Sequence, residues 1–249
     1  MQQLGLIGYP LTHSFSADYF TRKFAREGLS TKYRYDNFPL ADLAALEQLF
    51  ADYRDTLLGL NVTIPYKEQV IPYLDELHPA ARTIGAVNTI HCQSDGRRIG
   101  YNTDVIGFRD SLLDFLATSG GPARAALILG TGGAAKAVAW VLAQLQIPYQ
   151  YVSRKPQPGQ LSYAQLDKTI LEEHDLIVNT TPLGMAPKLA SCPDIPYHYM
   201  NKMHRLYDLV YNPAETLFLQ RGAAQGAAIC NGLAMLHGQA EAAWRIWTN

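Results

Sequence analysis

Short apolar runs alternate with amphipathic stretches along the first hundred residues of the chain. The apolar runs have the length of buried strands, and we expect strands over residues 4–7, 32–38, 57–64, 86–91 and 98–101. The stretches between them place apolar residues at helical spacing, and we expect helices over residues 17–26, 40–50 and 66–77. This alternation predicts a mostly parallel sheet with helices on its faces.

The same alternation resumes in the second half of the chain. A connecting helix is expected over residues 104–116, and Ser119-Gly120-Gly121-Pro122 then breaks the chain, which we take as a junction between two domains. Beyond the break we expect strands over residues 125–129, 149–152, 176–179, 206–210 and 227–230, and helices over residues 134–145 and 233–247. The last helix carries one apolar stripe, formed by Leu233, Leu236, Ala240, Ala243, Trp244 and Trp247.

Size and charge limit the classes of partner. The 249 residues are 48% hydrophobic, which is enough for one large core or two modest ones. Lysine and arginine number 21 and aspartate and glutamate 22, so the net charge of −1 argues against nucleic-acid and membrane-surface partners. We expect no signal peptide, because no basic segment followed by an apolar one opens the chain, and no membrane span, because no apolar run reaches about 18 residues.

The cysteine content indicates the compartment. Cys92, Cys192 and Cys230 are too few and too scattered for a disulfide framework or a zinc ribbon. We therefore expect reduced, mostly buried thiols, no metal site and a location in the cytoplasm.

A glycine-rich turn indicates a dinucleotide site. Gly130-x-Gly132-x-x-Ala135 follows an expected strand and opens an expected helix, which is the context of the dinucleotide-binding fingerprint. Gly130 permits a tight turn, Gly132 permits close approach of a pyrophosphate, and Ala135 permits close helix–sheet packing. Free N–H groups at the helix N-terminus favour an anion. The alternative is a glycine-rich turn that binds nothing.

The end of the next expected strand bears on the choice of dinucleotide. Domains that select NAD carry an acidic residue about 20 residues after the turn, to bind the ribose 2′-hydroxyl. This chain has Ser153-Arg154-Lys155 instead, and two cations suit a 2′-phosphate. We therefore predict a preference for NADP; the alternative is a solvated basic loop.

Three polar clusters, at residues 61–67, 85–89 and 101–104, stand at the ends of strand-like runs. Together they supply Lys67, Asp104 and several neutral hydrogen-bonding groups, which suits proton transfer on a small polyol. We place Lys67 in the first turn of the expected helix after Pro65. Each residue also has a local explanation: Lys67 as a surface lysine, Asp104 at a favoured helix N-terminus.

Three further polar residues have similar local explanations. Ser16 is a candidate N-cap, Asn88 a candidate turn residue, and Gln239 a candidate solvated side chain on the last helix.

The ordered set of motifs resembles the shikimate dehydrogenase family over essentially the whole chain. The matching segments are Ser14-Phe15-Ser16, 61–67, 85–89, 102–104, 130–135, 179–185, 207–213, Asn231-Gly232 and Gln239. The resemblance implies reversible, NADPH-dependent reduction of 3-dehydroshikimate to shikimate in aromatic amino-acid biosynthesis. It also implies an α/β substrate domain (residues 1–105 and 233–249) with a Rossmann-type NADP-binding domain (residues 106–232) inserted into it.

The resemblance also implies residue roles. Lys67 and Asp104 form the catalytic pair. The residues implied to bind substrate are Ser14, Ser16, Thr63, Asn88, Tyr211 and Gln239. The residues implied to bind the cofactor are Gly130, Thr131, Gly132, Gly133, Ala134, Ser153, Arg154, Lys155, Leu209 and Gly232, of which Leu209 and Gly232 flank the nicotinamide. This chain departs from the family where the usual Asn-Arg-Thr is Ser153-Arg154-Lys155, where a further basic residue is Pro158, and where the usual alanine of the turn is Thr131.

Two other functions stay open. A quinate or quinate/shikimate dehydrogenase of the same family differs in accepting a C1 hydroxyl and is distinguished by activity on quinate with NAD. A non-catalytic sensor of shikimate-like ligands would be favoured by loss of Lys67 or Asp104, and both are present. We expect small-molecule partners only, and a monomer or homodimer.

Overall fold

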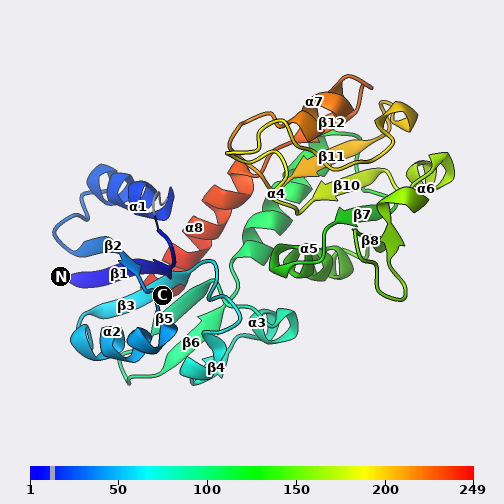
Figure 1. Cartoon of the computed structure of the whole chain (residues 1–249). Helices are drawn as coiled ribbons and strands as arrows, with labels where there is room; N and C mark the ends of the chain where they lie inside the picture. Colours follow the sequence, from blue (N-terminus) through cyan, green and yellow to red (C-terminus); the bar gives the residue numbers. More distant parts are fainter. Residues whose placement is uncertain (12–14) are drawn as a thin grey trace. The chain divides into compact units, whose positions relative to one another are not determined.

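The computed structural model describes residues 1–11 and 15–249, and the chain divides into two compact units. The first unit comprises residues 1–103 and 240–249, and the second comprises residues 104–239. Each unit contains a six-stranded sheet with helices packed against it (Figure 1). The predicted α/β fold class with two mostly parallel sheets is confirmed. The break at residues 119–122 lies inside the second unit, because the helix before it also belongs to that unit.

The first unit is built around a mixed sheet. Its strands are β1 (Gln2–Gly8), β2 (Tyr33–Pro39), β3 (Leu57–Val62), β4 (Glu76–Leu77), β5 (Thr89–Cys92) and β6 (Arg98–Tyr101). Its helices are α1 (Phe15–Arg26), α2 (Leu46–Asp52) and α3 (Pro79–Ile84), with 3-10 helices η1 (Leu43–Ala45) and η2 (Ile71–Tyr73). The strand order is β2-β1-β3-β5-β6-β4, with β5 antiparallel to both neighbours. Asn61 pairs with Thr89, and Thr89 pairs with Tyr101. The ends of β3, β5 and β6 that bear polar residues therefore lie side by side along one edge of the sheet, the edge that is formed by strand ends.

Alternating side chains bury both faces of β1. Leu6 packs in a cluster with Phe20 of α1, whereas Ile7 packs on the other face with Leu46 of α2. Figure 1 shows α1 and α2 on opposite sides of this sheet. The final helix, α8 (Leu233–Thr248), contributes its residues from 240 onward to the first unit, where Trp247 joins the cluster under α1. Because successive side chains of a strand point to opposite faces of the sheet, β1 contributes to two separate hydrophobic clusters.

The second unit has a fully parallel sheet. Its strands are β7 (Ala126–Leu129), β8 (Tyr149–Ser153), β9 (Leu161–Ser162), β10 (Leu176–Asn179), β11 (Arg205–Asp208) and β12 (Ala228–Cys230). Its helices are α4 (Asp104–Thr118), α5 (Gly133–Gln144), α6 (Lys168–Glu173), α7 (Leu217–Ala223) and the start of α8, with 3-10 helices η3 (Tyr163–Gln165) and η4 (Tyr197–Tyr199). Each adjacent pair of strands is parallel.

The order of these strands locates a ligand site. The sheet runs β12-β11-β10-β7-β8-β9, which is the doubly wound order 3-2-1-4-5-6 read from its far edge. The direction of winding reverses between β7 and β10. Ligands of open α/β sheets bind beyond the carboxyl ends of the strands at this switch point, which here lies beside Gly130 and Thr180.

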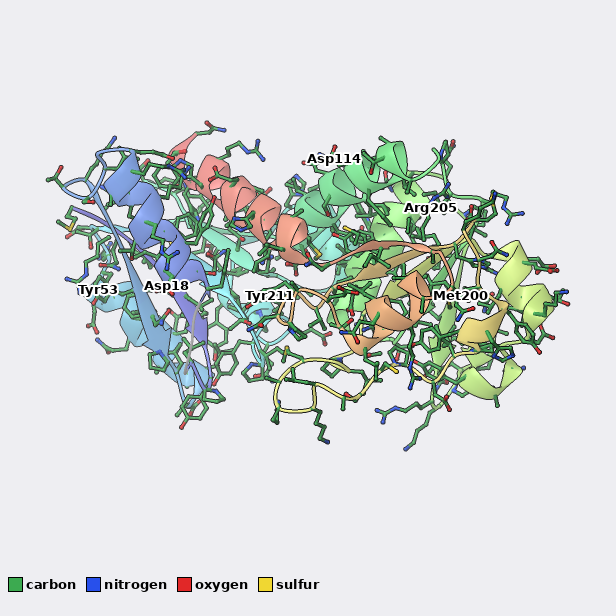
Figure 2. The ribbon with its side chains drawn as sticks, turned by 90° about the horizontal axis from the view of Figure 1, so that it is seen from above. Asp18, Tyr53, Asp114, Met200, Arg205 and Tyr211 are labelled. Carbon is green, nitrogen blue, oxygen red and sulfur yellow. The ribbon has the colours of Figure 1, made fainter. Side chains whose placement is uncertain are left out.

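A buried ion pair links β11 to the segment before β10 at the opposite end of the second sheet. Arg205 begins β11 (Figure 2), and its Nη1 lies 3.1 Å from Oδ2 of Asp175, with both side chains 7% exposed. Asp175 Oδ1 also accepts the backbone N–H of Arg124 at 2.9 Å, and Arg205 Nε donates to Ser119 O at 2.8 Å. The additional hydrogen bonds offset part of the desolvation that a buried pair incurs.

The prediction of a helix over residues 66–77, and with it the placement of Lys67 in the first turn of a helix, is wrong. The segment from 64 to 70 forms turns, followed by η2 and the short strand β4. Pro72 removes a backbone donor from the middle of the predicted helix. The carbonyl of Lys67 accepts from the N–H of Val87 at 2.7 Å. In a regular helix it would accept from the N–H of Ile71, which here donates to the carbonyl of Glu68 instead.

Other differences are smaller. The helix predicted over residues 40–50 is divided into η1 and α2, where Asp42 accepts the N–H of Ala44 as an N-cap. The short elements α3, α6, α7, β4 and β9 were not predicted. In the described part of the chain, no helix combines the length and apolar character needed to cross a membrane.

Candidate active site

Asn88 is the centre of a buried polar cluster in the first unit. Its Oδ1 accepts the backbone N–H of Thr103 at 2.7 Å and the hydroxyls of Thr103 and Thr89 at 3.2 and 3.1 Å. Its backbone N–H donates to Tyr101 O at 3.0 Å, and Asn88 is only 3% exposed. The amide therefore fixes the turn that leads directly into Asp104. This is the local turn role that the sequence allowed; a contact with substrate stays a prediction.

A chain of hydrogen bonds extends this cluster to α1. Asn61 Nδ2 donates to Thr89 Oγ1 at 3.2 Å and to Asn88 O at 3.3 Å, and its Oδ1 accepts the Tyr35 hydroxyl at 2.8 Å. Burial raises the pKa of Tyr35, and its hydrogen bond with Ser16 offsets part of that shift. Residues from α1, β2, β3 and β5 thus share one polar network at the edge where the sequence places the substrate.

Lys67 is half-buried in the turns after β3. Its backbone carbonyl is bonded to Val87, the residue before Asn88. Thr63, at the start of the same segment, donates its N–H to Ile7 O at 2.9 Å and accepts from the N–H of Tyr66 at 3.0 Å. The backbone around Lys67 is therefore attached to the same sheet edge as the Asn88 cluster.

Asp104 is the first residue of α4 and is 8% exposed. A carboxylate in this position interacts favourably with the helix dipole. It belongs to the second unit, but the residue before it, Thr103, belongs to the first and is held by Asn88. Chain connectivity therefore ties the start of α4 to the Asn88 cluster.

The glycine turn has the backbone of a dinucleotide cradle. Gly130 has a φ of 112°, and a Cβ there would lie 2.7 Å from Thr180 Oγ1, so the position requires glycine. Cβ atoms built on Gly132 and Gly133 meet no described atom within 4 Å. Gly132 caps the 12-residue helix α5 and offers no side-chain acceptor to its first N–H groups. These observations fit the pyrophosphate of a dinucleotide.

The basic pair lies where a 2′-phosphate would be expected. Ser153 ends β8, and its Oγ accepts the N–H of Lys155 at 3.2 Å in a tight turn. Arg154 and Lys155 are both exposed. The donor set of this turn fits NADP, as the sequence predicted.

The loops after β10 and β11 complete this sheet edge. Thr180 Oγ1 donates to Leu129 O at 2.7 Å, and Leu209 N–H donates to Asn179 O at 3.0 Å. A Cβ on Gly232 would lie 2.1 Å from Leu209 O, so only glycine fits there. Tyr211 follows in the same loop and is 38% exposed (Figure 2).

The predicted site residues divide between the two units. Thr63, Lys67 and Asn88 share a sheet edge in the first unit, with Ser16 joined to them through Tyr35 and Asn61. The second unit holds the remaining predicted residues: Asp104, Gly130, Thr131, Gly132, Gly133, Ala134, Ser153, Arg154, Lys155, Leu209, Tyr211, Gly232 and Gln239. Ser14 lies outside the described residues.

Sequence reasoning assigned no role to several residues of these networks. They are Tyr35, Asn61, Thr89 and Thr180. The signal that could have found most of them was position: Asn61 is the second-last residue of β3, Thr89 is the first residue of β5, and Thr180 directly follows β10.

Comparisons with known proteins identify the family. The pattern of the shikimate dehydrogenase substrate binding domain matches residues 6–90. Shikimate dehydrogenase (NADP(+)) of Carboxydothermus hydrogenoformans is 39% identical over 98% of this chain and 90% of its own length. Shikimate 5-dehydrogenase of Thermus thermophilus, solved with NADP(H) and shikimate, is 33% identical, with a TM-score of 0.82 and coverage of 100% of this chain and 94% of that one. Quinate dehydrogenase of Corynebacterium glutamicum, solved with NAD, is 27% identical, with a TM-score of 0.87 and coverage of 99% and 93%. The resemblance seen in the motifs is thus confirmed, and this chain belongs to the shikimate dehydrogenase family.

Proposed function

We propose that this protein is an NADP-dependent oxidoreductase that interconverts 3-dehydroshikimate and shikimate. The single observation that carries the proposal is the combination of the dinucleotide cradle at Gly130 with the polar edge around Lys67 and Asn88, in a chain of this family. When bound, the reduced nicotinamide supplies a hydride to the carbonyl carbon of the substrate. The protein must therefore supply orientation and a proton.

The cofactor assignment depends on the second unit. The N–H groups at the start of α5 would hold the pyrophosphate, and Arg154 and Lys155 would hold the 2′-phosphate. Leu209 and Gly232 would lie beside the nicotinamide. We further propose that residues 106–232 form the NADP-binding domain, and residues 1–105 and 233–249 the substrate domain. The parallel 3-2-1-4-5-6 sheet supports the first assignment.

For the chemistry, we propose that Lys67 and Asp104 act as a pair. In the reducing direction Lys67 gives a proton to the carbonyl oxygen, and in the oxidising direction it takes that proton back. Asp104 orients Lys67 and accepts a hydrogen bond from the substrate hydroxyl. A positioned acid or base of this kind contributes roughly 10²–10⁴-fold to the rate.

Substrate binding is assigned to the polar network and its surroundings. Ser14, Ser16, Thr63, Asn88, Tyr211 and Gln239 would bind the carboxylate and hydroxyls of the substrate. The bonds that fix Ser16 through Tyr35, and Asn88 through Asn61, support this assignment, because a rigid set of donors and acceptors binds a polyol with little loss of conformational entropy.

A crossed assay tests the proposal. Absorbance at 340 nm is followed with shikimate or quinate as substrate and NADP⁺ or NAD⁺ as cofactor. We expect the highest kcat/KM with shikimate and NADP⁺. Turnover of quinate with NAD⁺ at a higher kcat/KM would assign the chain to quinate dehydrogenases instead, and binding of shikimate without turnover by any pair would indicate a sensor.

The compartment and assembly complete the proposal. The three cysteines are free and half-buried, and burial raises the pKa of Cys230 to about 11. Unpaired cysteines suit the reducing cytoplasm, where we place the enzyme. We expect a monomer or homodimer.

A further inference from the structure

Asp208 is a fully buried carboxylate that the proposed chemistry does not use. It ends β11, and its two oxygens accept hydrogen bonds from three separate segments. Oδ1 accepts Asn179 Nδ2 at 2.9 Å and the N–H of Val210 at 3.0 Å, and Oδ2 accepts the hydroxyl of Thr216 at 2.5 Å. Thr216 in turn caps α7 by accepting the N–H of Leu219.

Two of the three segments lead to the proposed cofactor site. Asn179, held by Asp208, accepts the N–H and the hydroxyl of Thr181 at 3.0 and 2.7 Å. The neighbouring Thr180 bonds to Leu129 O and is the residue that a Cβ on Gly130 would strike. The loop after β10 is therefore clamped between Asp208 and the glycine turn.

The second connection runs through Val210. This residue lies between Leu209 and Tyr211, and its carbonyl accepts the N–H of Gly232 at 3.2 Å. Holding Val210 N–H therefore fixes the two backbone segments, around residues 209–211 and 232, that are proposed to flank the nicotinamide.

We propose that Asp208 is a positioning residue for the dinucleotide, holding the loops after β10 and β11 in the geometry that binds it. This inference rests on the proposed function, because it takes the switch point of the second sheet to be the NADP site. Asp208 acts through Asn179 and Val210 and does not itself touch the reacting atoms.

The chemistry of the site supports a role beyond stability. Burial raises the pKa of Asp208 to about 6. At neutral pH the carboxylate is therefore ionised despite the free-energy cost of removing its charge from water. Such a group destabilises the fold relative to a neutral isostere of the same shape. Buried polar groups of this kind are expected where orientation of a site is needed.

The second unit offers a matched control. Asp175 is also a buried carboxylate and accepts a backbone N–H at 2.9 Å. It precedes β10, at the opposite end of the same parallel sheet from Asp208. Its loss removes two buried hydrogen bonds and the ion-pair partner of Arg205, so the cost to the fold is at least as large, without touching the switch point.

The test is calorimetric titration of the purified full-length protein with NADP⁺, together with the melting temperature of each variant. Asp208→Ala should raise the Kd for NADP⁺ at least tenfold. Asp208→Asn should restore it to within threefold of wild type, because the amide oxygen can accept both Oδ1 bonds and its NH₂ can donate to the hydroxyl of Thr216. Asp175→Ala should lower the melting temperature but keep the Kd within twofold.

Three results would overturn the inference. They are a folded Asp208→Ala protein with a Kd within twofold of wild type, an Asp175→Ala protein that weakens NADP⁺ as strongly, and an Asp208→Asn protein as weak as the alanine variant. If Asp208→Ala does not fold, Asn179→Ala decides: a Kd raised at least fivefold supports the inference, and a smaller change rejects it. Failure of wild type to bind NADP⁺ would instead reject the proposed function.

Discussion

The hydrogen-bond network that joins Tyr35, Asn61 and Thr89 allows the loss of stability in Asn61→Ala to be predicted. The substitution removes three hydrogen bonds, at 2.8, 3.2 and 3.3 Å. At about 1 kcal/mol for each bond, the free energy of unfolding should fall by about 2–3 kcal/mol. For a chain of this size, that corresponds to a fall in melting temperature of about 4–12 °C.

The kinetic consequence should be confined to one substrate. Asn61 bonds to the carbonyl of Asn88, so its loss loosens the proposed shikimate site. We expect the KM for shikimate to rise several-fold while the KM for NADP⁺ stays within twofold, because all the proposed cofactor residues lie in the other unit. Differential scanning fluorimetry and steady-state kinetics at 340 nm measure the two effects.

A control variant and a refuting result sharpen this prediction. Asn37→Ala truncates an exposed asparagine of β2 in the same unit, and should change stability by no more than about 0.5 kcal/mol. If Asn61→Ala melted within 1 °C of wild type (roughly 0.3–0.5 kcal/mol), or raised both KM values equally, the network would not hold the proposed substrate site.

Three further outcomes are expected. Gly130→Ala should raise the KM for NADP⁺ at least tenfold, whereas Gly159→Ala, also at positive φ but with no described atom within 4 Å of the added Cβ, should cost about 1–2 kcal/mol of stability and leave that KM unchanged; equal kinetics for both variants would contradict the cradle. Arg154→Ala should raise the KM for NADP⁺ about 10–100-fold, from loss of a charge-assisted bond, but not the KM for NAD⁺, which lacks the 2′-phosphate; a parallel rise for both would place Arg154 elsewhere. The pKa of Asp208, about 6 in the folded state and above its unfolded value, means that the folded state binds this proton more tightly, so stability is lost as the pH rises through 6. From pH 5 to pH 8, urea titrations should therefore show wild type losing about 1–2 kcal/mol relative to Asp208→Asn, and a constant difference would contradict that assignment.

Local signals in the sequence were sufficient for much of the fold. The glycine turn at Gly130 marks both the end of β7 and the start of α5, and the predicted boundaries agree with the observed ones to within one residue. The apolar runs of the second unit likewise predicted its longer parallel strands. These features depend on neighbours in sequence, which a single chain reveals.

What could not be predicted depends on contacts across the sheet. The failure over residues 66–77 arose because Val87, twenty residues away from Lys67, takes the carbonyl that a helix would have used. Asn179 and Asp208 are 29 residues apart and look like ordinary strand ends until the order of the strands makes them neighbours. The roles assigned to individual site residues came from the family resemblance and stay predictions.

The most direct measurement of the central claim is kcat for Lys67→Ala with saturating shikimate and NADP⁺. The account predicts a fall of about 10²–10⁴-fold with little change in either KM, because Lys67 is proposed to transfer the proton and not to bind the ground state. Lys168→Ala, which truncates an exposed lysine of α6, should turn over like wild type. A Lys67→Ala enzyme with a kcat close to that of wild type would contradict the account.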